Sequence, residues 1–313
     1  MKEWIVRDQT PIRLDRFFSR ELPEVSYGTL QQYLRQNKLK VNGKKVPLST
    51  RIQAGDIVRA YLPQVSKEKV HTDAWLNAKP IFSCLYEDDE VMIGYKPAGI
   101  LTLDESEKTS DTFQNRARRF LHDNQRLSDD YLPRVCHRLD TGTSGLILIA
   151  KTEQAEHQLL SLIRGRSIRK QYLCVTFGHP KPEACTMEAY LVKDAQNSRV
   201  RIALQACKGG QKIITAYRTL ARSGALALLE VTLVTGRTHQ IRAHMASIGC
   251  PVLGDGKYGI EKENRLRRMK YQALCAYRLT FPALEGPCSG LSEKTFTCDF
   301  PWYAQQIMEG TLL

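Results

Sequence analysis

Apolar residues recur at helical spacing in two stretches near the N-terminus. The two sets are Leu14, Phe17, Phe18 and Leu22, followed by Leu30, Tyr33 and Leu34. Because residues three and four apart share one face of a helix, each set predicts a helix with one buried side. Ser26 is a suitable N-cap for the second helix, and Asn37 suits a left-handed residue just after its end.

The pattern then changes to strand-like. Residues 39–46 predict a strand, an Asn42-Gly43 turn and a returning strand, because Asn-Gly is the preferred two-residue hairpin turn. Residues 57–62 predict another strand after the turn at Ala54-Gly55-Asp56. Residues 64–79 mix polar and charged types without periodicity, which favours a linker.

Beyond the linker, strand-length apolar runs alternate with amphipathic stretches. Strands are predicted over 91–95, 146–150 and 226–233, and helices over 111–122 and 153–163. The chain thus divides into a small N-terminal domain (1–63), a linker (64–79) and a larger domain (80–313). No internal repeat or low-complexity tract is visible.

Charge narrows the class of partner. The 313 residues carry 46 Lys and Arg against 33 Asp and Glu, a net charge of +13. Twelve basic and six acidic residues lie in the first 63 positions, so the small domain is densely positive. A basic surface attracts polyanions, which makes nucleic acid a candidate partner; a soluble protein that is merely basic is the alternative.

The cysteine pattern and the lengths of the apolar runs indicate in which cellular compartment the protein is expected. The nine cysteines are scattered without a Cys-x-x-Cys pair, which favours reduced structural thiols and gives no zinc-ligand spacing. The N-terminus lacks the apolar region of a secretory signal, and no run of 18 apolar residues exists. We therefore expect a cytoplasmic protein without a membrane segment or bound metal, and a monomer as the simplest state.

A polar loop leads into the apolar run 146–150. The loop, residues 137–145, contains two glycines, three hydroxyl side chains and the carboxylate of Asp140. Such a loop at a strand end can fix one carboxylate at the floor of a cleft. Taken alone, Asp140 could equally be a turn or cap residue, and Arg138 an ordinary surface cation.

The whole string 137–145 resembles the His-Arg-Leu-Asp-x-x-Thr-Ser-Gly signature of RluA-type RNA pseudouridine synthases at every fixed position. Further blocks agree in order with that family. They are Lys96-Pro97-Ala98-Gly99, Arg169-Lys170-Gln171-Tyr172, Gly236-Arg237-Thr238-His239-Gln240-Ile241-Arg242 and the following His244, Gly249, Pro251, Gly254-Asp255 and Tyr258-Gly259. The resemblance covers nearly all of the chain after the linker. It implies an α+β fold with a mixed, mostly antiparallel central sheet, flanking helices and a cleft across the middle.

The N-terminal domain resembles the S4 RNA-binding domain, a small α/β module. The resemblance rests on the order of elements, on Leu34-x4-Leu39-x-Val41-Asn42-Gly43 and on Gly55-Asp56. The chain departs from the pattern at Tyr27-Gly28, where S4 domains are usually basic, and at Asn37, where glycine is usual. A generic helical hairpin with a β-hairpin is the alternative.

The resemblance implies a catalytic set of three residues. Asp140 is the expected nucleophile or base, and Arg242 is expected beside it, gripping the carboxylate with both arms and keeping it ionised. Tyr172 is expected to stack on the uracil ring while its hydroxyl guides a proton. A structural ion pair for Arg242 and ordinary core packing for Tyr172 are the alternatives.

Other residues of the same blocks are expected to bind the RNA. Arg138 is implied to fill the space that the extruded uridine leaves. His137 either takes a direct part in the chemistry or only shapes the loop. Leu139 and Ile241 are expected to form an apolar floor that excludes water, with core packing as the alternative. Arg237 and Lys170 are expected to contact phosphates, whereas others of the basic run 164–170 could simply be solvated.

We therefore expect an RNA isomerase that needs no cofactor and acts on uridines in structured RNA, with ribosomal RNA favoured over tRNA. A non-catalytic RNA-binding protein on the same scaffold is the main alternative. A carboxylate-based nucleoside glycosidase is a further one, and it requires a second carboxylate opposite Asp140, for which Asp255 is the candidate near these motifs.

Overall fold

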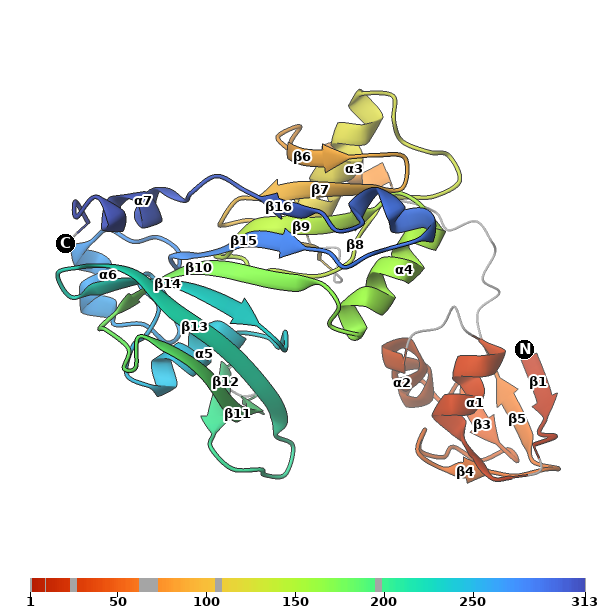
Figure 1. Ribbon diagram of the computed structural model, residues 1–313. Helices are drawn as coiled ribbons and strands as arrows, with labels where there is room; N and C mark the ends of the chain where they lie inside the picture. Colours follow the sequence, from red (N-terminus) through yellow and green to blue (C-terminus); the bar gives the residue numbers. More distant parts are fainter. Residues whose placement is uncertain are drawn as a thin grey trace. The chain divides into compact units, whose positions relative to one another are not determined.

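The computed structural model describes residues 2–8, 10–22, 27–61, 73–104, 109–194 and 199–312. The chain divides into two compact units, Met1–Thr72 and Asp73–Leu313, and each is described by itself (Figure 1). The predicted N-cap Ser26 and most of the predicted linker lie outside the described residues. The end of that predicted linker belongs to the second unit, where the 3-10 helix η1 (Asp73–Asn77) sets Trp75 against His122 with ring centroids 5.2 Å apart.

The first unit has its own small core. Its elements are β1 (Lys2–Ile5), β2 (Ile12–Arg13), α1 (Leu14–Glu21), α2 (Tyr27–Arg35), β3 (Leu39–Val41), β4 (Arg51–Ile52) and β5 (Ile57–Ala60). The sheet order is β1-β5-β3, and β2 pairs with β4. The predicted apolar face of α1 is buried, since Leu14, Phe17 and Phe18 are at most 2% exposed. Asn37 has the predicted left-handed conformation, with φ 60°.

The returning strand predicted after Asn42-Gly43 is wrong. Both turn residues have positive φ as expected, but Lys44 makes only an isolated bridge back to Val41. The partner of β3 is β5 instead, because the Asn42 side chain bonds forward to that strand. Its Oδ1 accepts from the amide of Ile57 at 2.8 Å, and its Nδ2 donates to Asp56 at 2.8 Å.

The second unit is built on one large sheet. Its strands are β6 (Ser83–Glu87), β7 (Val91–Lys96), β8 (Arg134–Val135), β9 (Ser144–Ala150), β10 (Arg169–Phe177), β11 (Ala184–Asp194), β12 (Arg199–Ala203), β13 (Gln211–Ser223), β14 (Leu226–Leu233), β15 (Leu274–Thr280) and β16 (Thr295–Thr297). The order is β12-β11-β13-β14-β10-β15-β9-β7-β6, with β16 on β15 and β8 on β9. Only β9 and β15 run parallel among these pairs, so the sheet is mixed and mostly antiparallel, as predicted.

Helices cover both faces of this sheet. They are α3 (Phe113–Asp123), α4 (Glu153–Arg164), α5 (Gln240–Ser247), α6 (Glu261–Leu266), the 3-10 helix η2 (Gly286–Leu291) and α7 (Trp302–Met308). Both helices predicted in this unit are confirmed, and each begins after a threonine, Thr112 or Thr152, whose hydroxyl accepts from the third residue beyond it.

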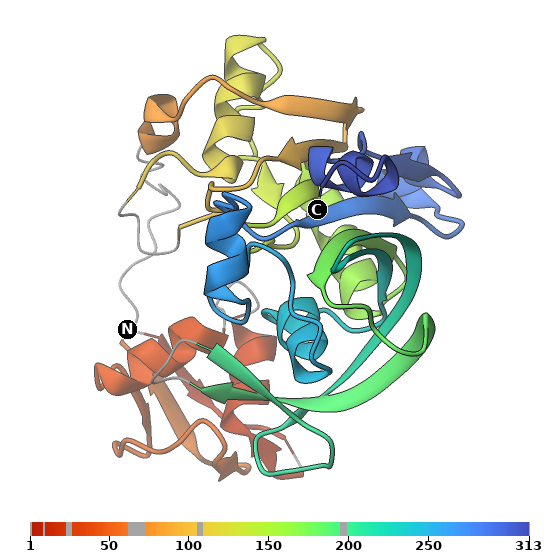
Figure 2. The same ribbon diagram turned by 90° about the vertical axis from the view of Figure 1, so that its left-hand side faces the viewer.

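Alternation along the strands produces two cores. Leu146 and Leu148 of β9 pack with α4 and α7, whereas Ile147 and Ile149 pack with α3 and α5. Successive strand side chains point to opposite faces, and the run 146–150 is apolar throughout, as suits a strand that is covered on both faces. In Figure 2 the yellow helix α3 stands beside the orange strands β6 and β7.

A glycine sets the close approach of the two parallel strands. Gly145 has φ 122°, and a Cβ there would lie 2.4 Å from the backbone nitrogen of Ala276 in β15. Only glycine allows β9 to start this close to β15. The polar loop before β9 is thereby held over the middle of the sheet. Among the described residues, no helix is both long and apolar enough to cross a membrane.

Candidate active site

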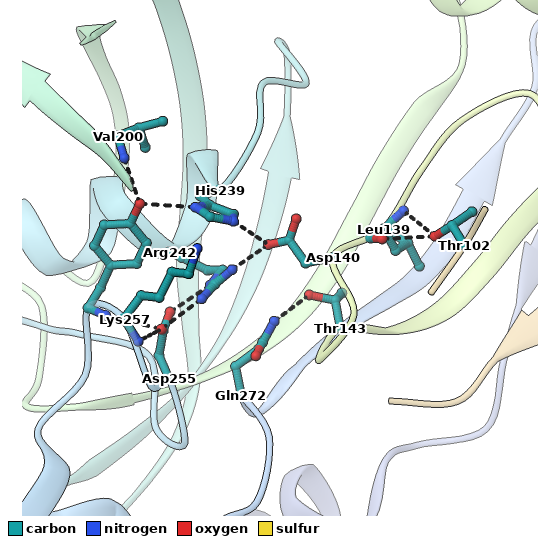
Figure 3. A network of polar contacts seen from close by, with 11 residues as sticks. Thr102, Leu139, Asp140, Thr143, Val200, His239, Arg242, Asp255, Lys257 and Gln272 are labelled. Atoms are coloured by element: carbon teal, nitrogen blue, oxygen red, sulfur yellow. Dashed lines mark hydrogen bonds and ion pairs between the residues drawn. The ribbon is translucent and has the colours of Figure 1, made fainter. Parts of the chain in front are cut away.

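Hydrogen bonds from several segments hold the loop that carries Asp140. The Thr102 hydroxyl donates to the carbonyl of Leu139 at 2.8 Å and accepts from its amide at 3.2 Å. The carbonyl of Asp140 itself accepts from the amide of Thr143 at 2.9 Å. On the other side of the loop, Gln272 donates to the Thr143 hydroxyl at 3.0 Å (Figure 3). The loop is therefore fixed before any substrate binds.

A buried ammonium group completes this support. Lys96 is fully buried, and its Nζ donates to the carbonyls of Pro97, Ile100 and Thr141 at 3.0, 2.8 and 3.2 Å. Burial lowers its pKa to about 8, and the charge of Asp140 partly opposes that shift. Sequence reasoning gave Lys96 no role beyond its motif. A lysine before a Pro-x-Gly turn, upstream of a buried strand end, was the available signal.

His137 supports the strand side of the loop. Its Nε2 accepts from the amide of Leu148 at 3.1 Å. An imidazole nitrogen that accepts an N–H carries no proton of its own, so the ring is neutral. Burial, with a smaller contribution from the charge of Lys170, lowers the pKa of His137 to about 3. This geometry favours the loop-shaping alternative for His137 over direct chemistry.

Arg242 joins two carboxylates at the base of the site. Its Nη1 donates to Oδ2 of Asp140 at 2.6 Å, while Nε and Nη2 donate to the two oxygens of Asp255 at 2.7 and 2.8 Å. The expected two-armed grip on Asp140 is therefore wrong. The fork of the guanidinium is occupied by Asp255, so only one N–H is directed at Asp140.

Asp255 is the anchor of this arrangement. It is 1% exposed, and its Oδ1 also accepts from the amides of Lys257 and Tyr258 at 2.8 and 3.1 Å. Burial alone would raise the pKa of Asp255, but the hydrogen bonds and charge of Arg242 outweigh it and lower the pKa. Both oxygens are engaged on the inner side of Arg242. Asp255 is thus not placed as the opposing carboxylate that a glycosidase requires.

A second ring stands beside Asp140. His239, the N-cap of α5, lies with Nε2 at 3.8 Å from Oδ2 of Asp140 and Nδ1 at 3.0 Å from the hydroxyl of Tyr258 (Figure 3). Sequence reasoning passed over both residues as parts of motifs. Three positions separate His239 from Arg242, which puts both near one face at the start of a helix, and this spacing was the signal.

The Asp140 side chain opens to a cavity of about 850 Å³. Its walls include Leu139, Asp140, Tyr172, His239 and Arg242. Asp140 is 25% exposed, and in Figure 3 its second oxygen carries no contact with the other residues drawn. A uridine nucleotide fits a cavity of this size.

The walls are apolar on one side and basic on the other. Tyr172, 7% exposed, and Leu139 pack in the same core cluster as Ile241, which contacts a smaller adjoining cavity. Burial, and then the charge of Asp140, raise the pKa of Tyr172, so its phenol keeps its proton at neutral pH.

The expected RNA-binding cations are also at this cavity. Arg138, Lys170 and Arg237 line it, and burial lowers the pKa of Lys170. Arg164, Arg166 and Arg169, from the same basic run, are exposed and are not among its lining residues. Every candidate site residue predicted from the sequence therefore borders this cavity or its neighbour. Within the described parts of the chain, no three His, Cys, Asp or Glu side chains gather as a metal site.

The sheet of the second unit, with its covering helices, is the fold of a class of protein, the pseudouridine synthases. Two solved human structures have this fold. RNA pseudouridylate synthase domain containing 4 matches with a TM-score of 0.60, 22% identity and coverage of 73% of this chain and 92% of that one. RNA pseudouridylate synthase domain containing 1 matches with a TM-score of 0.54 and 21% identity, and the match covers 74% of this chain and 95% of that one.

Sequence comparison then gives the family. The profile of the RNA pseudouridylate synthase family matches residues 90–247. Ribosomal large subunit pseudouridine synthase C of Rickettsia felis is 35% identical over 266 residues, 82% of this chain and 85% of that protein. An uncharacterized RNA pseudouridine synthase of Chlorobaculum parvum is 32% identical over 263 residues, 80% of this chain and 76% of that protein. The chain belongs to the RluA-type RNA pseudouridine synthases and is an enzyme of that family.

Proposed function

We propose that this enzyme isomerises a specific uridine of ribosomal RNA, with Asp140 as the nucleophile. One observation carries the proposal. Asp140 is tied through one oxygen to Arg242 at 2.6 Å, while its side chain faces a basic and aromatic cavity of about 850 Å³. A carboxylate held in this way has a fixed orientation and a negative charge, and it can still accept further hydrogen bonds or react.

The reaction breaks the N1–C1′ bond of uridine, turns the base and joins C5 to C1′, and overall a proton leaves C5 and N1 gains one. In our proposal Asp140 acts at the ribose, and Arg242, anchored by Asp255, fixes its aim. Tyr172 supplies a flat, neutral surface for the detached base. Leu139 and Ile241 keep water from the reaction, since water would divert it toward free uracil.

Getting the uridine into the cavity is the role proposed for the cations. The extruded base leaves a gap in the RNA, and the exposed Arg138 next to Asp140 is positioned to fill it. Arg237 and Lys170 at the rim would hold phosphates. His137 takes no chemical step in this scheme, because its accepting nitrogen is occupied by Leu148.

Ribosomal RNA is proposed as the substrate on two grounds. Several relatives at 32–35% identity, such as that of Rickettsia felis, are named ribosomal large subunit pseudouridine synthases. The first unit supports the same conclusion as an S4-like RNA-binding domain. Four lysines, Lys38, Lys40, Lys44 and Lys45, lie on or beside β3, and none of them forms an ion pair within the described part of that unit.

Pseudouridine mapping tests the proposal. Ribosomal RNA and tRNA would be mapped by carbodiimide labelling in cells lacking the protein, then in cells given wild type or Asp140→Asn. We expect one or a few ribosomal sites to disappear in the deletion, to return with wild type and to stay absent with Asp140→Asn. Restoration by Asp140→Asn would refute the nucleophile, and loss confined to tRNA would refute the substrate. Unchanged maps would favour the non-catalytic RNA-binding alternative.

A further inference from the structure

The tautomer of His239 is fixed by its neighbours. The Tyr258 oxygen accepts from the backbone amide of Val200 at 2.9 Å and lies 3.0 Å from Nδ1 of His239. Among the described residues, Nδ1 is the acceptor within reach of the Tyr258 proton, so the arrangement that satisfies every group has the phenol donating to Nδ1. The proton of the neutral ring is then on Nε2, the nitrogen that faces Asp140.

That Nε2–H has no acceptor at bonding distance among the described residues. Oδ2 of Asp140 lies 3.8 Å away, beyond hydrogen-bond range, and already accepts from Arg242 at 2.6 Å. His239 lines the same cavity as Asp140 and Tyr172. The Nε2–H of His239 is thus a hydrogen-bond donor with a fixed direction next to Asp140. Such a donor is suited to an acceptor that arrives with the substrate.

The backbone is also committed to this orientation. His239 has φ 56° and ψ 17°, a left-handed conformation uncommon for residues other than glycine. It precedes α5 directly, so Arg242 follows one turn later on the same helix. Such backbone outliers persist where surrounding contacts fix them, and they are frequent at functional sites.

We propose that His239 is a further substrate-contacting residue, whose Nε2–H donates to an oxygen of the target nucleotide beside Asp140, and that Tyr258 is the positioning residue that sets this tautomer. The inference rests on the proposed role of Asp140. The acceptor is either a ribose hydroxyl or a uracil carbonyl, since both present oxygens near C1′.

The charges around His239 agree with a neutral donor. Burial lowers its pKa; Asp140 and Asp255 act in the opposite direction, while Arg242 and Lys257 lower it further. At neutral pH the ring therefore offers one N–H and carries no charge. Protonation of Nδ1 would displace the Tyr258 proton from its acceptor, and the donor arrangement would change at acid pH.

Kinetics of isosteric variants test the donor. Tritium release from RNA labelled at uridine C5, prepared from cells lacking the protein, would give kcat and KM for wild type, His239→Gln, His239→Leu and Tyr258→Phe. His239→Gln can return an N–H near the Nε2 position, and we expect it to keep kcat/KM within about threefold. His239→Leu should lose about 10- to 100-fold, the effect of one lost hydrogen bond to substrate. The kcat/KM of Tyr258→Phe should lie between the values of the two His239 variants. On acidification this variant should lose activity at a higher pH than wild type does, because Nδ1 becomes free to protonate.

Controls separate the possible failures. His157→Gln makes the same change at an exposed histidine of α4, and thermal unfolding of each variant identifies those with a damaged fold. An active Asp140→Asn would overturn the proposed function. An inactive Asp140→Asn together with a fully active His239→Leu would overturn only the role of His239. A folded His239→Gln as weak as His239→Leu would show that ring shape matters rather than the donor, and would also refute it.

The two candidate oxygens are distinguished by binding. RNA oligonucleotides spanning a mapped target, with ribose or 2′-deoxyribose at that uridine, would be titrated against wild type and His239→Leu. If the ribose hydroxyl is the acceptor, the substitution weakens binding of the ribose form only. If a uracil carbonyl is the acceptor, both forms weaken by the same factor. Equal affinities of the two proteins for both oligonucleotides would refute the contact.

Discussion

Asp140 receives a 2.6 Å hydrogen bond from Arg242, a residue 102 positions further along the chain. The aspartate stands on the loop before β9, and the arginine on the first turn of α5. Neither segment determines the bond alone, because Arg242 is itself oriented by the carboxylate of Asp255. The position of Asp140, the proposed nucleophile, therefore depends on Asp255, which does not line the cavity.

Asp255→Asn is expected to slow the reaction, although residue 255 does not contact the substrate. Loss of this charge leaves the buried guanidinium with Asp140 as its remaining charged partner, which costs about 3–5 kcal/mol of stability. Arg242 also becomes free to move, and a displacement of about 1 Å at a reacting group lowers kcat by roughly 100-fold. Urea unfolding and the rate of tritium release would measure the two effects.

The matched control for this variant is Asp111→Asn. That carboxylate forms a two-bond ion pair with Arg116 at 2.6 and 2.8 Å, and neither residue lines the cavity. It should lower stability less, because Asp111 is partly exposed, and leave kcat unchanged. A wild-type kcat for folded Asp255→Asn would contradict the anchoring role.

Short-range sequence patterns gave correct predictions for the strands and helices that were predicted in the second unit, which are a minority of its described elements. The helices at 111–122 and 153–163 and the strands at 146–150 and 226–233 were predicted within a few residues. The two helices have strong periodicity, and the strand 146–150 is an unbroken apolar run that is buried along its length. The predicted hairpin after Val41 was wrong because β3 pairs along its length with β5, and the Asn42 side chain bonds to Asp56 and Ile57 at the start of that strand.

The site was predictable as a set of residues but not as a geometry. Motif resemblance brought Asp140, Tyr172 and Arg242 together before any coordinates. Resemblance could not say that Asp255 takes the fork of Arg242, or that Lys96 lies buried beneath the loop. Those contacts join segments far apart in sequence, α5 with Asp255 and the end of β7 with the loop at Thr141.

Lys96→Met is expected to change how stability responds to alkaline pH. The folded pKa of Lys96, about 8, lies below the usual 10.5 because of burial. Between these values the unfolded chain binds more protons than the folded one, so the contribution of Lys96 to stability rises with pH. From pH 8 to 10.5, the free energy of unfolding of wild type should rise relative to that of Lys96→Met by on the order of 3 kcal/mol.

Chemical unfolding at several pH values would measure this difference. Lys262→Met, at an exposed lysine of α6, controls for the loss of one positive charge. Its difference from wild type should stay flat where that of Lys96→Met rises. A flat difference for both variants would contradict the buried state of Lys96. We also expect Lys96→Met to lower kcat, since the carbonyl of Thr141 loses its ammonium partner.

His137→Gln is expected to protect the fold from acid. The pKa of His137 is about 3 in the folded chain, below the ordinary 6.5, because the ring is buried and lies near the charge of Lys170. The unfolded chain binds the extra proton first, so wild type loses stability as pH falls from 6.5 toward 3. Glutamine can accept the same amide and does not titrate.

Comparison of unfolding curves at pH 7 and pH 4.5 would test this. His137→Gln should lose less stability on acidification than wild type, whereas His137→Leu should be destabilised already at pH 7 by about 1–3 kcal/mol for the unpaired amide. The three proteins should have similar kcat values while folded. A loss of activity in folded His137→Gln would instead assign chemistry to this ring.

Tyr172→Phe separates the two functions expected of the tyrosine. The ring, which is needed for stacking, is kept, while the hydroxyl is lost. If the hydroxyl guides a proton, kcat should fall by about 10²- to 10⁴-fold with KM within about threefold. Tyr172→Leu removes the ring as well and should raise KM further.

The control for Tyr172→Phe is Tyr217→Phe on β13. The ring of Tyr217 lies in the same core cluster, but its hydroxyl donates to the carbonyl of Pro182 at 2.9 Å and does not line the cavity. It should leave kcat unchanged. Because burial and the charge of Asp140 raise the pKa of Tyr172, ionisation of this phenol should cause no loss of rate between pH 7 and 10. A wild-type kcat for Tyr172→Phe would leave Tyr172 with stacking alone. The proton would then have to move through another group, and His239, 3.8 Å from Asp140, is a candidate.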